Sequence, residues 1–248
     1  MDRLIYTAMT AMNAAMDRQR VVANNLANAS TTGFRQEIFA VTPATLKDGS
    51  LEARAPARGN VRGADMTAGR VVPTGNAMDV ALEGKALLAF QSPDRQGEVY
   101  SRRGDLRVAA SGVIENGEGL AVLGEGGSPI TVPPGFNLAI AADGTIMARD
   151  PASPTAPAEA IDKLRLVNPE GSPLAKGIDT FLKVPNGGVL PPDPTARLTP
   201  AALEMSNVET ADTLVQMIDA QRAFEQRAKI IATAGDLDEA SSSLMTLR

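Results

Sequence analysis

The chain has 248 residues and contains no histidine, no cysteine and no tryptophan. The absence of histidine and cysteine excludes Ser-His-Asp and Cys-His nucleophiles, imidazole and thiolate metal ligands, and redox cysteines. Aromatic residues make up only 3% of the chain, which leaves few rings on which a sugar or a base could stack. We therefore expect no cofactor and no metal site, and any catalysis would have to rely on carboxylates or lysine.

Positive charge and long apolar runs are also scarce. The 24 Lys and Arg residues against 29 Asp and Glu residues give a net charge of −5, and no basic run occurs. This balance argues against a nucleic-acid partner or an anionic lipid surface, because both require a basic face. No stretch approaches the roughly 20 apolar residues of a membrane span. The first 20 residues also lack the apolar core of a signal peptide, so we expect any export to leave the chain uncleaved.

The sequence contains two kinds of candidate chemical site, glycine-rich loops that could bind phosphate and carboxylates that could act in catalysis. The glycine-rich stretch at residues 116–124 misses the G-x-G-x-x-G spacing, and Gly84 lacks the surroundings of a phosphate-binding P-loop, so we interpret both as turns. Asp143, Asp150 and Glu159 are carboxylates that in principle suit acid-base catalysis. Nothing in the sequence makes them converge, and solvated turn residues are the simpler interpretation. We expect no small-molecule substrate.

A helical period runs along the first segment, from Asp2 to Asn28. Apolar residues recur at alternating steps of four and three, as in the seam of a coiled coil, with polar Gln19 at one position. The helix should end at residues 28–33, where Asn, Ser and Gly favour a turn. Such a helix cannot bury its own stripe, so we predict an assembly interface that includes Ile5, Met9, Met12, Met16, Ala23 and Leu26.

The last segment repeats this pattern. Ser206 and Glu209 have the S-x-x-E spacing of a capping box, so we expect a helix to begin there and to fray near Gly235. Its apolar residues recur at three and four, and they complete the predicted assembly interface with Leu214, Ile218, Phe224, Ala228 and Ile231. The two stripes are too far apart in sequence to pair locally. They must pair with each other or with other chains.

The middle of the chain changes to short runs of β-forming residues separated by Gly, Pro and Asp. We expect an α+β fold, in which an antiparallel all-β central domain lies between N- and C-terminal amphipathic helices that form a coiled coil on assembly. The expected parts are residues 1–35, a helix and turn; 36–69, an extended linker; 70–200, the β domain; and 201–248, the C-terminal helix. The expected strands are 78–82, 86–91, 98–101, 105–108, 119–123, 137–140, 144–147, 164–168 and 180–184.

Two terminal blocks closely resemble signatures of the flagellar axial proteins of the rod and hook. The first block, at the end of the N-terminal helix, comprises Asn24, Asn25, Leu26, Ala27, Asn28, Thr31, Thr32, Gly33 and Phe34. The second comprises Ser206, Asn207 and Val208, followed by Gln221, Arg222, Ala223, Phe224 and Glu225. Residues 73–82 and 100–106 are also similar to runs in that family, so the resemblance covers essentially the whole chain.

Within the family, residues 1–6, 123–135 and 164–169 look most like the proximal-rod branch, with the distal-rod branch as the alternative. The stretch at 83–88 and the Arg102-Arg103 pair depart from the usual family pattern. The length leaves little room for the inserted domain that hook proteins usually carry. The resemblance therefore implies a structural, non-enzymatic rod subunit.

For function, the resemblance implies that the terminal helices form the inner coiled-coil layer of a helical tube in the periplasm, which transmits torque. It implies export by the flagellar type III apparatus, and partners among inner proximal rod proteins, the distal rod protein and copies of the same chain. The turn after the first helix would set the angle between layers. An alternative of another class remains open: a carboxylate-dependent enzyme that cleaves peptidoglycan.

Overall fold

The computed structural model describes residues 2–43, 57–94, 97–153, 156–177 and 179–246. The chain divides into two compact units. The terminal unit comprises Met1–Ala27, Glu37–Gly63 and Glu209–Arg248, and the β unit comprises Asn28–Gln36 and Ala64–Val208. The β unit thus extends beyond the predicted 70–200 on both sides, because the segment after the first helix and the segment before the last one pack into it.

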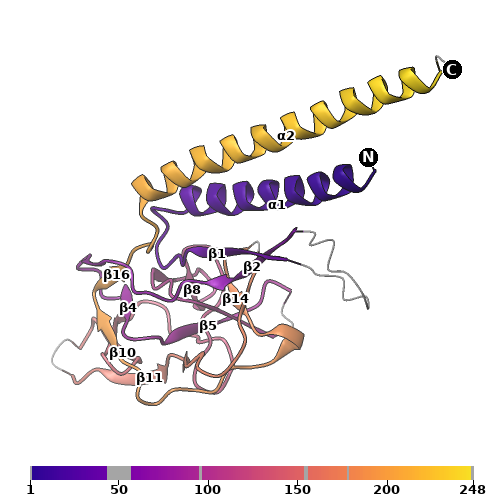
Figure 1. Ribbon diagram of the computed structural model, residues 1–248. Helices are drawn as coiled ribbons and strands as arrows, with labels where there is room; N and C mark the ends of the chain where they lie inside the picture. Colours follow the sequence, from indigo (N-terminus) through magenta and orange to yellow (C-terminus); the bar gives the residue numbers. More distant parts are fainter. Residues whose placement is uncertain (1, 44–56, 95–96, 154–155, 178, 247–248) are drawn as a thin grey trace. The chain divides into compact units, whose positions relative to one another are not determined.

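The terminal unit contains the two long helices and two strands (Figure 1). Helix α1 (Asp2–Ala27) and helix α2 (Thr210–Thr246) pack against each other. Strands β1 (Glu37–Pro43) and β2 (Ala57–Ala64) form a two-stranded sheet. Residues 36–69, predicted as an extended linker, therefore contain paired strands; Ile38, Phe39 and Val41 are the strand-forming residues that this interpretation undervalued. No helix in the described ranges is both long and apolar enough to cross a bilayer.

The boundaries of α2 correct two details of the sequence analysis. The helix begins at Thr210, four residues after the predicted start, and the Ser206 hydroxyl accepts a bond from Val208 N, two residues on, at 3.2 Å. A capping box requires a bond three residues on, so the prediction was wrong. The first turn is closed by Thr213 N, which donates to Glu209 O at 3.0 Å. At the other end the helix runs through Gly235 without a break.

The β unit is built from short strands in several small antiparallel sheets. A five-stranded sheet has the order β12-β5-β6-β14-β13, and a three-stranded sheet has the order β11-β10-β9. Three strand pairs, β15-β4, β16-β3 and β7-β8, complete it. The bounds are β3 (Val71–Pro73), β4 (Val80–Leu82), β5 (Leu87–Gln91), β6 (Glu98–Ser101), β7 (Leu106–Val108), β8 (Ile114–Asn116), β9 (Asn137–Ile140), β10 (Thr145–Arg149), β11 (Glu159–Lys163), β12 (Leu166–Val167), β13 (Ala175–Lys176), β14 (Leu182–Lys183), the 3₁₀ turn η1 (Pro185–Gly187), β15 (Leu198–Pro200) and β16 (Ala202–Glu204).

The sequence located most of these strands but not all. The predicted strand at 119–123 is instead a turn followed by isolated bridges, such as the one between Phe90 and Val122. Six described strands of the β unit were not predicted: β3, β8, β11, β13, β15 and β16. Among them β3, β15 and β16 have only three residues each and carry no alternating pattern of their own. Their pairing is long-range: Glu204 lies opposite Val71 and Leu198 opposite Leu82.

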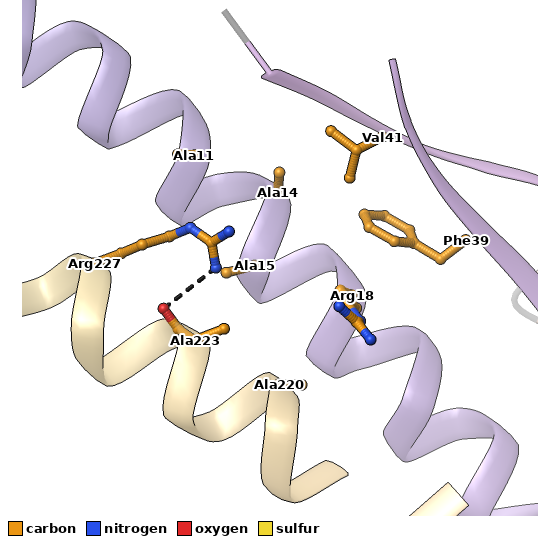
Figure 2. A pocket seen from close by; sticks show the side chains of 9 residues that line it. All are labelled: Ala11, Ala14, Ala15, Arg18, Phe39, Val41, Ala220, Ala223 and Arg227. Atoms are coloured by element: carbon orange, nitrogen blue, oxygen red, sulfur yellow. Dashed lines mark hydrogen bonds between the residues drawn. The ribbon is translucent and has the colours of Figure 1, made fainter. Parts of the chain in front are cut away.

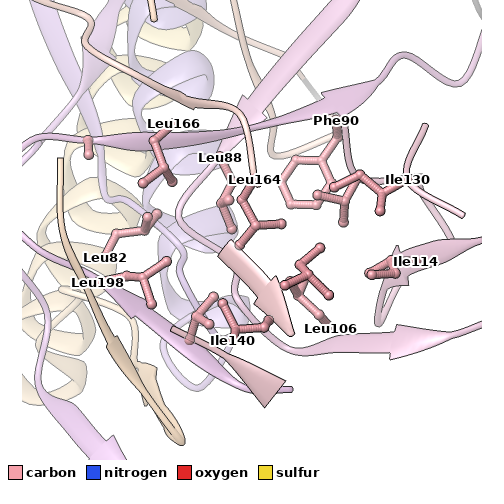
Figure 3. Close-up of a cluster of buried hydrophobic side chains, with 14 of the residues drawn as sticks. Leu82, Leu88, Phe90, Leu106, Ile114, Ile130, Ile140, Leu164, Leu166 and Leu198 are labelled. Carbon is pink, nitrogen blue, oxygen red and sulfur yellow. The ribbon is translucent and has the colours of Figure 1, made fainter. Parts of the chain in front are cut away.

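The core of the β unit is aliphatic (Figure 3). Phe90 and Phe181 form its ring pair, with centroids 6.2 Å apart in an edge-on arrangement. Leu88, Ile114 and Ile146 are fully buried around it. Each such side chain stabilises the fold by about 1.5–3 kcal/mol when fully buried. The β unit thus has a core of its own, formed from strands spread over residues 80–198.

Candidate assembly interface

The buried side of the helix pair consists of small residues. On α1 the buried residues include Ala14, Ala15, Val21 and Val22, and on α2 the apolar ones are Ala220 and Ala234. Half-buried Met217, Phe224 and Ile231 complete a regular repeat on α2. Small side chains allow the helix axes to approach closely but bury little apolar area. The contact between α1 and α2 therefore combines small buried residues with larger half-buried ones.

A second apolar face of both helices stays exposed. On α1, Met9 and Met16 lie seven residues apart and are 46% and 50% exposed. On α2 the exposed fractions are 48–58% for Leu214, Val215, Ile218, Ile230 and Leu237. Side chains seven residues apart share one face of a helix. Met9, Met16 and Ala23 share an exposed face of α1 with Asn13 and Arg20, and on α2 Leu214 and Ile218 share a face from which Ile230 and Leu237 point away. Each helix thus exposes apolar side chains in addition to those it buries.

The predicted interface residues divide between exposed and half-buried positions of the two helices. Among the described side chains of the predicted set none is fully buried. The exposed members are Met9, Met16, Ala23, Leu214 and Ile218, and the half-buried members are Met12, Leu26, Phe224, Ala228 and Ile231. Ile5 lies in α1, but its side chain is outside the described residues. The predicted set therefore includes residues of the half-buried repeat of α2, such as Phe224 and Ile231, together with exposed ones, and its role in assembly stays a prediction.

The asparagine block at the end of α1 fixes the strand that follows. Asn25 is 2% exposed, its side-chain oxygen accepts from Glu37 N at 2.8 Å, and its amide donates to Glu37 O at 3.1 Å. Asn24 donates to the Glu37 carboxylate at 2.7 Å. An asparagine amide presents one donor and one acceptor, so it pairs with a peptide group as a strand would. The first strand is thereby attached to α1 by side-chain amides.

The Thr-Thr-Gly-Phe part of the same block belongs to the β unit. Gly33 has φ +67°, and its N–H donates to Glu204 O at 2.7 Å. A Cβ at this position would overlap the backbone of Arg102, so glycine is required for both conformation and space. Phe34 is buried, and Lys176 Nζ lies 3.4 Å from its ring centre, a cation–π contact. Asn28 accepts a bond from the Thr31 hydroxyl at 3.1 Å within the turn.

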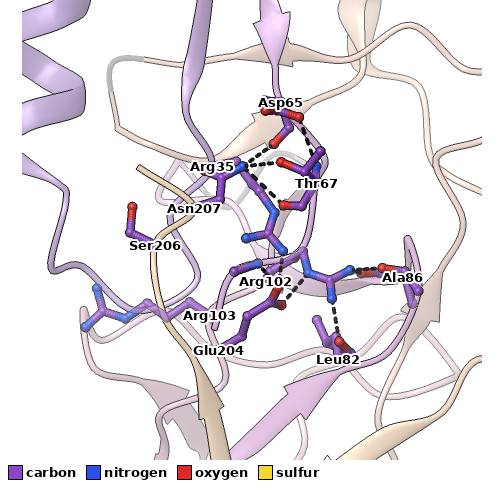
Figure 4. A network of polar contacts seen from close by, with 12 residues as sticks. Arg35, Asp65, Thr67, Leu82, Ala86, Arg102, Arg103, Glu204, Ser206 and Asn207 are labelled. Atoms are coloured by element: carbon purple, nitrogen blue, oxygen red, sulfur yellow. Dashed lines mark hydrogen bonds and ion pairs between the residues drawn. The ribbon is translucent and has the colours of Figure 1, made fainter. Parts of the chain in front are cut away.

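A buried ion triad connects three distant parts of the β unit (Figure 4). Glu204 accepts from Arg35 Nη2 at 2.5 Å through one oxygen and from Arg102 Nε at 2.6 Å through the other. The side chains of all three are at most 2% exposed. The N–H of Gly69 also donates to Glu204, at 2.8 Å. Two cations thus share one carboxylate, so the triad carries an excess positive charge.

The guanidinium groups of Arg35 and Arg102 differ in how many of their N–H donors have a hydrogen-bond partner. Arg102 also donates to the carbonyl oxygens of Leu82, Gly84 and Ala86. Arg35 has no such set: in the described part of the chain its Nε and Nη1 are buried without a hydrogen-bond partner. Burial lowers the pKa of Arg102 below its ordinary value, opposed by the attraction of Glu204. Arg102 therefore organises the surrounding loops, whereas Arg35 depends on Glu204 alone.

The Ser-Asn-Val block is a connector and not the start of the helix. The Asn207 side-chain oxygen accepts from Gln36 N at 2.7 Å, and its amide donates to the carbonyls of Asp65 and Thr67 at 2.9 and 3.1 Å. Val208 is buried. Asn207 therefore holds together three chain segments of the β unit where they lie beside one another, immediately before α2 begins.

The second half of the C-terminal signature lies on α2. Gln221, Arg222 and Glu225 are exposed, Phe224 is half-buried, and Ala223 lines a cavity between the helices. Sequence reasoning missed Arg35, Arg102 and Glu204 as structural residues. The one available signal was their position: Arg35 directly follows the first signature block, and Glu204 lies two residues before the second.

The candidate catalytic carboxylates occupy separate surface positions. Asp143 is exposed and accepts from the Thr145 N–H and hydroxyl at 3.1 and 2.9 Å, and these bonds, first the one from the N–H, lower its pKa. Asp150 accepts from Ala152 N at 2.8 Å in another turn, and Glu159 is exposed on β11. Across the described ranges no three acidic side chains gather to hold a metal ion. These carboxylates have the local bonds of turn residues.

Comparisons with known proteins agree with the signature blocks. Family models match at residues 5–35 ("Flagella basal body rod protein"), at 81–148 ("Flagellar hook protein FlgE/F/G D1 domain") and at 199–244 ("Flagellar basal body rod FlgEFG protein C-terminal"). The chain is 36% identical to FlgF of Salmonella typhimurium and 37% identical to FlgF of Escherichia coli, over the full length of each. The chain belongs to the FlgF family of flagellar basal-body rod proteins.

FlgF membership excludes the two alternative functions that the sequence analysis left open. FlgG of Bacillus subtilis is 28% identical over 99% of both chains, so the FlgF interpretation is confirmed over the FlgG alternative. The chain is a structural, non-enzymatic subunit of the flagellar rod, which removes the peptidoglycan-cleaving alternative. Membership in this family implies assembly with other rod proteins.

Proposed function

We propose that this chain is a proximal rod subunit that polymerises helically through the exposed stripes of α1 and α2 and transmits torque. The observation that carries the proposal is the second apolar face, with Met9, Met16, Leu214 and Ile218 each about half exposed. Full burial of such a side chain contributes about 1.5–3 kcal/mol, so the half still exposed is worth about 1 kcal/mol at each position. Contact with neighbouring helices would recover this free energy.

The proposed partners are other copies of the chain, the inner proximal rod proteins and FlgG, within the periplasm. Export by the flagellar type III apparatus would precede assembly. A stripe on one helix that meets a different surface on the next subunit makes a heterologous contact, and repeated heterologous contacts generate an open filament. A rod requires that kind of contact.

The helix pair is proposed to complete its folding on assembly. Its fully buried apolar residues are mostly small, such as Ala14, Ala15 and Ala220, and small side chains bury less apolar area to set against the ordering of two long helices. Amide exchange on the free chain tests this. We expect fast exchange in α1 and α2 and slow exchange in the β unit; protection of residues 5–26 in the free chain would contradict folding on assembly.

A matched pair of variants tests the role of the stripe. Met16→Asp places a charge on the exposed apolar face and should prevent incorporation into basal bodies, because a buried unpaired carboxylate is strongly unfavourable. Met16→Leu keeps an apolar side chain of similar size at the same position and should leave incorporation unchanged. Both variants should keep the β unit folded, as measured by its denaturant midpoint. Normal rods containing Met16→Asp would refute the stripe as an interface.

A further inference from the structure

Methionine supplies all the sulfur of this chain, which has 10 Met residues and no cysteine. Peroxides oxidise a methionine thioether to the sulfoxide, and the rate of this reaction follows the exposure of the sulfur atom. The product is a polar side chain in place of a flexible apolar one. The distribution of methionine between the surface and the interior therefore decides where the chain is sensitive to an oxidant.

Two methionines of α1 are more exposed than the others that the structure describes. Met9 is 46% exposed and Met16 is 50% exposed. The remaining methionines with a described side chain are all half-buried, namely Met12, Met66, Met78, Met147, Met205 and Met217. Among the described residues, the thioethers that an oxidant reaches most easily are thus Met9 and Met16.

Met9 and Met16 lie away from the buried side of α1. They are seven residues apart and therefore share one face of the helix. Ala11 and Ala14, each two positions from one of them, line a cavity that α1 shares with α2 and β1 (Figure 2). Two positions along a helix turn by about 200°, so these alanines lie nearly opposite the two methionines. The exposed thioethers are thus on the face of α1 that we assign to contact with neighbouring subunits.

We propose that Met9 and Met16 are oxidation sites of the unassembled chain, at which a peroxide prevents incorporation into the rod. The thioether sulfur gives two electrons to hydrogen peroxide: one oxygen atom becomes bonded to sulfur, the O–O bond breaks, and water is released. The sulfoxide oxygen is a hydrogen-bond acceptor, and its burial in an apolar contact without a donor is unfavourable. The oxidised chain is therefore excluded from the assembly.

This inference rests on the proposed function and adds a chemical condition to it. Because α1 is proposed to complete its folding only on assembly, both thioethers are at least as accessible in the exported chain as in the folded one. Assembly covers the same atoms. A completed rod is therefore protected from the oxidant, and sensitivity is confined to the subunits that have not yet been incorporated.

Mass spectrometry of the free chain tests the choice of sites. Dilute hydrogen peroxide is added for increasing times, and the sulfoxide fraction is measured at Met9, Met16 and Met147. We expect both methionines of α1 to react several times faster than Met147, which is half-buried on β10. Equal rates at the three positions would overturn the proposal.

Incorporation is tested first with variants that require no oxidant, produced in flagellated cells that lack their own FlgF. Met9→Gln with Met16→Gln imitates the polarity of two sulfoxides, and glutamine is a good helix former, so α1 itself is not weakened. Incorporation into basal bodies should fall at least roughly tenfold, the effect of losing about 1.4 kcal/mol. Met9→Leu with Met16→Leu is the matched control, which keeps apolar side chains of similar size and should be incorporated normally.

A peroxide pulse then connects oxidation with assembly. Cells that produce the natural chain or the Met9→Leu, Met16→Leu variant are treated briefly with hydrogen peroxide, catalase is added, and the basal bodies built afterwards are isolated. We expect incorporation of the natural chain to fall and that of the leucine variant to stay at the untreated level. An equal fall for both chains would overturn the proposal, because the oxidant would then act at another site.

The outcomes separate this inference from the proposed function. If the glutamine variant enters basal bodies as well as the natural chain does while Met16→Asp is excluded, the oxidation proposal is overturned and the proposed function stands. If Met16→Asp also enters normally, or if the untreated natural chain does not enter basal bodies at all, both fail.

Discussion

Replacing Glu204 by glutamine should severely destabilise the β unit. The carboxylate is 1% exposed and holds Arg35 Nη2, Arg102 Nε and Gly69 N within 2.5–2.8 Å. Glutamine keeps the shape but removes the only negative charge of the triad, and its amide N–H₂ would face other donors. Removing one partner of a buried ion pair costs about 3–5 kcal/mol. A domain has only about 5–15 kcal/mol of stability in total, so we expect a large fall in the denaturant midpoint.

The same structure predicts that Arg35→Met costs much less. Arg35 is the excess cation of the triad, and its Nε and Nη1 are unpaired within the described residues. Its removal leaves Glu204 neutralised by Arg102, so we expect a change below about 1.5 kcal/mol, in the range found when an ion is replaced by an apolar group of similar size. Arg102→Met should resemble Glu204→Gln instead, because it leaves three carbonyl oxygens without a donor.

Urea unfolding of the full chain measures how much each of these three substitutions lowers the free energy of unfolding. The chain has two tyrosines, so in a Tyr6→Phe background the fluorescence of Tyr100, in β6, follows the β unit alone. The reasoning is refuted if Glu204→Gln costs less than about 1 kcal/mol, the net value of one ordinary hydrogen bond. It is also refuted if Arg35→Met costs as much as Glu204→Gln, because the excess charge would then not exist.

Three further outcomes are expected. Burial is the main cause that raises the pKa of Tyr100 from 10.0 to about 12. Between these pH values only the unfolded chain loses the Tyr100 proton, so the free energy of unfolding should fall by about 2–3 kcal/mol as the pH rises from 10 to 12. Ionisation of Tyr100 near pH 10 in the folded protein, followed by absorbance in the Tyr6→Phe background, would contradict this. Asn25→Ala should destabilise the protein by about 1–3 kcal/mol for each backbone group of Glu37 that loses its hydrogen bond. Amide exchange at Glu37 should become faster while the core of the β unit keeps its protection. Unchanged exchange at Glu37 would exclude the anchoring role of Asn25. Gly235→Ala should raise helicity by circular dichroism and stabilise α2 by about 0.5–1 kcal/mol, since open space surrounds the added Cβ; a loss of helicity would show that the helix needs the glycine.

Local patterns were enough to predict the secondary structure of the ends. The period of three and four along residues 2–27 gave α1, and the turn residues after it gave its end, because both depend on neighbours within one or two turns. The start of α2 was wrong for a related reason. Ser206 has the right spacing for a cap, but Asn207 and Val208 are engaged in the β unit, and that tertiary contact delays the helix to Thr210.

The choice of buried face could not be predicted. Both helices carry large and small apolar residues at similar spacing; on α1 these include Met9 and Met16 and, on another face, Ala14 and Ala15. The periodicity favoured the larger side chains because they are more hydrophobic. In the structure Ala14 and Ala15 are buried, while Met9 and Met16 are about half exposed on the face proposed to meet other subunits. On α2 the larger Met217, Phe224 and Ile231 are half-buried in the same repeat as Ala220 and Ala234.

The sequence by itself determined the α+β class, the two helices, half of the described strands and, through the two signature blocks, the family. Those features reside in local propensity and in contiguous motifs. Only the tertiary structure joined Arg35, Arg102 and Glu204, paired β3 with β16, and placed Arg18 and Arg227 beside one cavity. These contacts join residues that are far apart along the chain. The sequence does not show whether a charged residue is buried or exposed, because its partner is brought beside it only by the fold.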